Sequence, residues 1–192
     1  MRTEKIILAS QSPRRAEILQ AIGWPFETMA AGIDETRGYN EDAVSYVKRL
    51  AMAKARAVAE RLAVGLILGA DTVVVVDGEI LGQPRDVADA KRMLLLLSGK
   101  WHDVLTAIAL FRVGQNSRWV SEHEITRVRF SELSAEEISW YVSSGEPMGK
   151  AGAYAIQGTA AIFIEEIQGD YFNIVGLPVR LLYKLTRRIG AD

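Results

Sequence analysis

Two adjacent arginines, Arg14 and Arg15, follow Ser12 and Pro13, a pair typical of a helix start. Because the positive end of the helix dipole lies there, each cation costs a few tenths to about 1 kcal/mol. The free amide groups of the same turn suit a phosphate, so a bound anion would turn both penalties into a site. The alternative is that both arginines point to solvent. The preceding strand-like run Leu8–Ser10 favours the anion site, because open α/β sheets bind ligands at such strand–turn–helix junctions.

Lys54 and Asp71 are further charges in apolar surroundings. Lys54 falls inside the apolar stripe of a predicted helix over about 41–62. It either extends its ammonium to solvent at the edge of the stripe or directs it into a cleft against a polyphosphate. Asp71 separates the apolar run Leu66–Ala70 from four valines. A carboxylate between two buried strand segments is costly unless it is paired, binds a metal or faces a cleft.

Two more segments carry polar groups suited to a ligand. Asp34 and Glu35 are adjacent carboxylates that, with Asp71, could hold Mg²⁺ or Mn²⁺ and leave one carboxylate to activate water. The alternative is that both are plain loop residues. The glycine-rich segment 145–158 lets its backbone approach a ligand closely, and the amide of Gln157 could pair with the edge of a base. This segment lacks the pattern of a Walker A loop and of a dinucleotide fingerprint.

The two histidines are not assigned to chemistry. We expect His102 to cap or orient a turn after Ser98 and Gly99, and His123 to lie on the surface of a strand. Two histidines far apart in sequence do not make a metal site with nearby spacing.

Composition limits the function classes. At 192 residues the chain has the size of one domain, or of one domain folded as two lobes. It has no cysteine, which excludes thiolate metal sites and fits a reducing compartment. Its net charge of −1 and lack of a basic block argue against a nucleic-acid footprint, and its apolar runs are too short to span a bilayer. We therefore expect a cytoplasmic protein that binds neither polymeric nucleic acid nor a membrane.

These residues must be positioned by alternating β-like and helix-like segments, which predict an α/β fold. Asn40 is the expected cap of the second helix, and Ser134 begins a capping box. The predicted elements are a strand over 6–9, a helix over 13–22, a helix over about 41–62, a strand over 66–70, a hairpin over 73–81, a helix over 86–98, paired strands over 104–111 and 119–130, a short helix after 134, a strand over 160–167 and a helix from 178.

The same segments, in the same order, resemble the Maf family of nucleotide pyrophosphatases. The resemblance rests on the blocks Leu8–Arg15, Leu50–Ala55, Gly69–Val73, Leu97–His102 and Gly176–Pro178. It implies one domain over 1–192 with an elongated mixed β-sheet, flanking helices and a central cleft, similar to the inosine-triphosphatase-like proteins. It also implies a divalent cation, Mg²⁺ or Mn²⁺, and cleavage between the α- and β-phosphates.

The resemblance further implies a role for each matching position. Asp71 matches the proton acceptor, and Glu35 matches an acidic residue near the metal, so these two are the metal-ligand candidates. Arg14, Thr72 and Gln157 match positions linked to base choice, and Arg15 and Lys54 match residues that serve the phosphates. We also assign Ser10 and Lys150 to substrate binding. Two positions depart from the family pattern: Gln83 replaces a lysine, and Gly149 replaces an aspartate.

The segment Lys150–Gly158 is similar to the branch that hydrolyses dTTP and UTP, so a pyrimidine nucleoside triphosphate is the expected substrate. Two alternatives stay open. One is the branch that acts on modified nucleotides such as 7-methylguanosine triphosphate; the other is a non-catalytic nucleotide-binding role in septum formation. The sequence also leaves a homodimer open.

Overall fold

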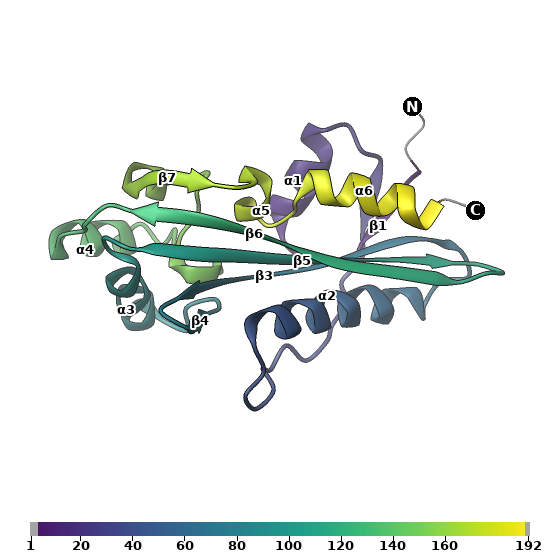
Figure 1. Ribbon diagram of the computed structural model, residues 1–192, viewed down its shortest axis with the longest axis horizontal. Helices are drawn as coiled ribbons and strands as arrows, with labels where there is room; N and C mark the ends of the chain where they lie inside the picture. Colours follow the sequence, from purple (N-terminus) through teal and green to yellow (C-terminus); the bar gives the residue numbers. More distant parts are fainter. Residues whose placement is uncertain (1–3, 191–192) are drawn as a thin grey trace. The chain divides into compact units, whose positions relative to one another are not determined.

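The computed structural model describes residues 4–190, in which helices alternate with the strands of a mixed, seven-stranded sheet (Figure 1). The strand order is β2-β1-β3-β5-β6-β7, and β4 pairs with β3. The strands are β1 (Ile6–Leu8), β2 (Phe26–Thr28), β3 (Gly65–Val76), β4 (Glu79–Leu81), β5 (Trp101–Val113), β6 (Arg118–Phe130) and β7 (Ile164–Gln168). The helices are α1 (Pro13–Ala21), α2 (Ala43–Ala59), α3 (Val87–Leu97), α4 (Ala135–Ser143), α5 (Tyr171–Val175) and α6 (Val179–Gly190), with short 3-10 segments η1 (Ala151–Ala153) and η2 (Thr159–Phe163). The α/β prediction is confirmed.

The residue contacts divide the chain into two compact units. The first comprises the described residues up to Asp71, together with Thr106–Glu124 and those from Gly176 onward. The second comprises Thr72–Leu105 and Ile125–Val175. Strands β3, β5 and β6 contribute residues to both units. In the part of the chain that the structure describes, no helix has the length and apolar character needed to cross a bilayer.

The first unit is organised around β1, which pairs in parallel with both β2 and β3. Its three residues, Ile6–Leu8, are all buried, as expected of a central parallel strand covered on both faces. Helix α2 lies on one side of the strands, and α1 and α6 lie on the other (Figure 1). Pro13 begins α1 as predicted, and Gly23 follows its end at a φ of +66°.

Two sequence predictions in this unit were wrong. The cap of α2 is Asp42, whose side chain accepts a hydrogen bond from the backbone N–H of Ser45 at 3.0 Å. Asn40 instead occupies a turn at a φ of +54°, a conformation that asparagine tolerates. Asp71 does not end a strand, because β3 runs without a break from Gly65 to Val76. The β-branched residues after Asp71 favour extended backbone and continue the strand.

Close packing between α2 and β3 sets the geometry of the first unit. A Cβ atom built on Gly69 would lie 2.1 Å from the backbone oxygen of Ala51 and 2.7 Å from the backbone nitrogen of Ala55. Only glycine permits this approach. The helix backbone therefore lies directly against the strand, near Lys54 on α2 and Asp71 on β3.

The second unit has its own hydrophobic core, built from α3, α4 and the inner faces of β3–β6. The predicted capping box of α4 is confirmed: Ser134 and Glu137 exchange hydrogen bonds between side chain and backbone. The 73–81 hairpin is confirmed as β3 paired with β4, and Asp86 caps α3 as expected of the residue that opens that helix.

Three features of the second unit differ from the sequence predictions. The strand expected over 160–167 begins only at Ile164, because the preceding residues form η2 and Glu146 accepts the backbone N–H of Thr159. The short helix α5 was not predicted. His102 lies in the core of β5 instead of capping a turn; it is 2% exposed and lies 2.9 Å from the hydroxyl of Tyr154 through Nε2.

Candidate active site

The centre of the candidate site is an ammonium group between two carboxylates. The Nζ atom of Lys54 lies 2.7 Å from Oδ1 of Asp71 and 3.0 Å from Oε1 of Glu35. Lys54 is 8% exposed and Asp71 is 7% exposed. Lys54 thus lies on the buried face of α2, and its ammonium is paired there with the two carboxylates.

Burial changes the basicity of Asp71. Desolvation raises the pKa of this carboxyl group above its usual value, while the charges of Lys54 and then Arg15 oppose the rise. A carboxylate whose pKa moves toward neutral pH accepts a proton more readily than an exposed one. The carboxylate of Asp71 is therefore more basic than that of an exposed aspartate.

Arg15 lies close to the same cluster, from the first turn of α1. Its Nε donates to the backbone oxygen of Gly176 at 2.8 Å, and a terminal nitrogen donates to Oγ of Ser10 at 3.1 Å. Arg15 is buried, and this burial lowers the pKa of its guanidinium; the charge of Asp71 opposes the effect. The alternative that both arginines point to solvent is therefore wrong for Arg15.

Arg14 and the helix start complete this part of the site. Arg14 is half-buried, and desolvation lowers the pKa of its guanidinium. Ser12 occupies the N-cap position of α1, but its side chain accepts no hydrogen bond from the first turn. The first turn of α1 thus has no side-chain cap, and free N–H groups at a helix start can bind an anion.

The structure separates the roles of the two adjacent acidic residues. Asp34 accepts hydrogen bonds from the backbone and the hydroxyl of Thr36 at 2.8 and 2.7 Å, and these bonds lower the pKa of its carboxyl group. Glu35 directs its carboxylate to Lys54, and its backbone oxygen accepts the hydroxyl of Tyr46 at 2.8 Å. Asp34 therefore shapes the loop, and Glu35 belongs to the charge cluster.

Arg49 also holds this acidic loop, and sequence reasoning missed it. Its guanidinium donates to both carboxylate oxygens of Glu41, at 2.7 and 2.8 Å, and to the backbone oxygen of Thr36 at 3.0 Å. Such two-point pairing is stronger and more directional than a single contact. The signal available in the sequence was the position of Arg49 on the helix that carries Lys54.

The remaining predicted residues lie in the second unit. Thr72 follows Asp71 in β3 and is half-buried, Gln157 is exposed, and Lys150 is half-buried and donates to the backbone oxygen of Glu146. The carboxylate of Glu146 accepts the backbone N–H of Thr159 at 2.9 Å and so connects the two ends of the glycine-rich segment. Glu146 is a second residue that sequence reasoning missed; its signal was that it is the one acidic residue inside that segment.

The carboxylates of the cluster suit a divalent cation. Within residues 4–190, no group of three or more histidine, aspartate or glutamate side chains is arranged to hold a metal. Asp71 and Glu35, however, already direct one oxygen each to the same cation, the ammonium of Lys54. One or two carboxylates together with substrate phosphates form the usual environment of protein-bound Mg²⁺. The residues present therefore fit such an ion.

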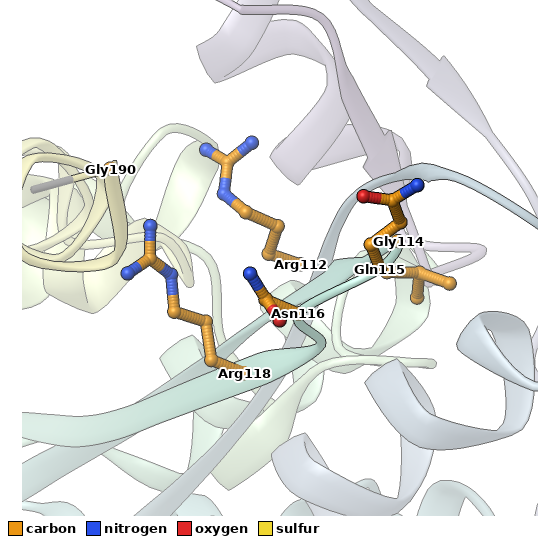
Figure 2. A pocket seen from close by; sticks show the side chains of 7 residues that line it. Arg112, Gly114, Gln115, Asn116, Arg118 and Gly190 are labelled. Atoms are coloured by element: carbon orange, nitrogen blue, oxygen red, sulfur yellow. The ribbon is translucent and has the colours of Figure 1, made fainter. Parts of the chain in front are cut away.

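A separate polar hollow of about 380 Å³ lies in the first unit (Figure 2). Figure 2 shows Arg112 and Arg118 extending from β5 and β6 in the same direction, near Gly190 at the end of α6. Arg112 makes two hydrogen bonds to the carboxylate of Glu4, at 3.0 and 2.7 Å. Cations near a helix C-terminus are stabilising, so the ion pair with Glu4 and the nearby end of α6 give Arg112 a structural role. None of the predicted site residues lines it.

Two solved structures share the fold of this chain. A Ham1 protein from Coxiella burnetii shares the fold with a TM-score of 0.54 and 16% identity over 96% of this chain and 100% of that chain. The Staphylococcus aureus Ham1 protein shares it with a TM-score of 0.50 and 12% identity over 96% and 99%. The chain is thus an α/β protein of the Ham1, inosine-triphosphatase-like fold, as predicted.

Within that fold class, the chain belongs to the Maf family. The family model described as Maf-like protein matches residues 5–189. A relative from Symbiobacterium thermophilum is 49% identical over 97% of this chain and 95% of its own, and one from Bacillus cytotoxicus is 48% identical over 94% and 93%. One from Bacillus cereus is 46% identical over 98% and 97%. All three bear the name dTTP/UTP pyrophosphatase. The family predicted from the sequence motifs is confirmed.

Proposed function

We propose that this chain hydrolyses dTTP and UTP to the nucleoside monophosphate and pyrophosphate. It is a nucleoside triphosphate pyrophosphatase, a hydrolase of phosphoric anhydrides. The names of the Maf relatives at 46% to 49% identity support this substrate choice. The observation that carries the proposal is the contact of Lys54 with both Asp71 and Glu35 in a buried position. This cluster places an ammonium that can pair with phosphate oxygens beside a carboxylate that can accept a proton from water.

The proposed chemistry is an in-line displacement by water. The water oxygen forms a bond to the α-phosphorus, and the bond from that phosphorus to the α–β bridging oxygen breaks. Pyrophosphate leaves, and the proton of the water passes to the carboxylate of Asp71. Burial supports this role, because it raises the pKa of Asp71 toward the working pH.

Charge stabilisation supplies most of the rate, since phosphoryl transfer asks little covalent chemistry of the protein. We assign the phosphate chain to Arg14, Arg15 and Lys54, with Ser10 and Lys150 as further substrate contacts. Asp71 and Glu35 would hold Mg²⁺ or Mn²⁺, which neutralises charge on the phosphates when bound. Thr72, Gln157 and Arg14 are the proposed readers of the pyrimidine. The cytoplasmic location and the homodimer stay predictions.

The decisive variant is Asp71→Asn, which keeps the shape of the side chain and removes its basicity. We expect the turnover of dTTP and UTP to fall by at least about 100-fold, the lower end of what a general base contributes. The control is Asp103→Asn on β5, a half-buried aspartate outside the cluster, which should keep wild-type turnover. Wild-type turnover in Asp71→Asn would refute the assignment of the base.

A substrate panel tests the reaction itself. Release of pyrophosphate is measured for dTTP, UTP, CTP, GTP and 7-methylguanosine triphosphate, each with Mg²⁺ and with Mn²⁺. We expect dTTP and UTP to be the best substrates. Preference for the methylated purine, or tight binding of dTTP without formation of the monophosphate, would overturn the proposal.

A further inference from the structure

Lys54 occupies the place between the two carboxylates that a divalent cation also needs. Its ammonium contacts one oxygen of Asp71 and one of Glu35, within 3.0 Å of each. A metal ion bound by both carboxylates would lie within a few ångströms of this ammonium. Because like charges repel strongly where little water screens them, the two cations compete for the same pair of acids.

Arg15, the other buried cation near the cluster, is held in place by its hydrogen bonds and cannot move away from the carboxylates to make room for a metal ion. Arg15 donates to the backbone oxygen of Gly176 and to the hydroxyl of Ser10, and it is buried. Lys54 carries its charge on four methylene groups, and its ammonium can change partners by rotations within the side chain. Glu35 is the more accessible of its two partners, with a side chain that is 54% exposed. Lys54 is therefore the group of the cluster that can exchange one anion for another.

We propose that Lys54 pairs with Asp71 and Glu35 in the nucleotide-free protein and releases them to a divalent cation only when a nucleoside triphosphate binds. The phosphate oxygens then replace the carboxylates as partners of the ammonium. Metal and nucleotide accordingly bind with positive coupling, and the protein without nucleotide has low metal affinity. This inference rests on the proposed function, since it takes the triphosphate as the anion that Lys54 accepts.

The first experiment measures Mn²⁺ binding to the folded protein without nucleotide, by the loss of the electron paramagnetic resonance signal of free Mn²⁺. Lys54→Met keeps a long, helix-compatible side chain and removes the charge. We expect this variant to bind Mn²⁺ at least about tenfold more tightly than the wild type. The matched control, Lys48→Met on the same helix, should bind Mn²⁺ like the wild type. If Lys54→Met is folded and binds Mn²⁺ no more tightly than the wild type, the proposal fails.

The second experiment needs no variant and so does not depend on the folding of Lys54→Met. Mn²⁺ binding to the wild type is measured with and without the α,β-imido analogue of dTTP, which cannot be cleaved between those phosphates. We expect the analogue to raise the Mn²⁺ affinity at least about tenfold, beyond the affinity of the analogue for Mn²⁺ in free solution, and Mn²⁺ to raise the affinity for the analogue by the same factor. Equal Mn²⁺ affinity with and without the analogue overturns the inference.

The two proposals fail in different ways. If dTTP and UTP are turned over but metal binding is independent of nucleotide, only the role of Lys54 is wrong. If neither nucleotide is hydrolysed, the proposed function is wrong, and the nucleotide-free comparison of Lys54→Met with the wild type still decides whether Lys54 blocks the metal.

Discussion

Replacement of Gly69 by alanine should open the contact that forms the candidate site. The new Cβ atom would lie 2.1 Å from the backbone oxygen of Ala51, whereas an ordinary carbon–oxygen contact is about 3.3 Å. Because the obstacle is helix backbone, α2 must move by about 1 Å. Overpacking of this kind costs about 3 kcal/mol, and the lower entropy of the unfolded alanine chain returns up to about 1 kcal/mol. The net loss of about 2 kcal/mol corresponds to a fall in Tm of about 4–8 °C for a chain of this length.

The same shift carries Lys54 away from Asp71, whose oxygen is now 2.7 Å from the ammonium. A displacement of about 1 Å at a reacting group lowers turnover on the order of 100-fold. Thermal unfolding by circular dichroism and pyrophosphate release from dTTP measure the two effects. The control is Gly82→Ala, because nothing lies within 4 Å of a Cβ at Gly82, and it should leave Tm unchanged or slightly raised. Wild-type Tm and turnover in Gly69→Ala would refute the close-packing argument.

Two further perturbations test the second unit. Burial lowers the pKa of His102 to about 4, so the unfolded chain takes up its proton first as the pH falls, and stability is lost between about pH 6.5 and pH 4. Denaturant unfolding should show that, between pH 7 and pH 4, the free energy of unfolding falls by about 3 kcal/mol more in the wild type than in His102→Gln. An equal fall in both proteins would contradict the role of His102. In Gly158→Ala the new Cβ would lie 2.3 Å from the carboxylate of Glu146, which holds Thr159 and Tyr141. Thermal unfolding should show that the free energy of unfolding falls by about 1–3 kcal/mol, and limited proteolysis should show faster cleavage within residues 145–158. An unchanged Tm would argue against a stabilising role for the hydrogen bonds of Glu146.

Local signals predicted most elements of the fold. The Ser12–Pro13 start of α1, the capping box at Ser134 and the hairpin over 73–81 each depend on contacts within a few residues, and such contacts are visible in sequence. The failures have local causes as well. Asn40 was expected to cap α2, but it occupies a left-handed turn, and Asp42, two residues later, caps the helix.

The charges of the candidate site were recognised by their conflict with their surroundings. Lys54 in an apolar helix stripe, Asp71 in an apolar strand and Arg15 at the positive end of a helix each break a local rule. Such conflicts indicate that a partner exists, but they do not identify it. The roles of Asp34 and Glu35 were equally open, because both are adjacent carboxylates in one polar loop.

The order of residues along the chain is enough to predict the alternation of strands and helices, the Maf motifs and the presence of charges that need partners. The pairs of groups that meet are visible only in the folded chain: Lys54 contacts Asp71, and Arg15 contacts the backbone of Gly176, 161 residues away in sequence. Hydrogen bonds and ion pairs depend on distances of about 3 Å between atoms, and no local pattern encodes a distance between remote segments. In the first unit that distance is set by Gly69, whose missing side chain allows α2 to lie directly against β3.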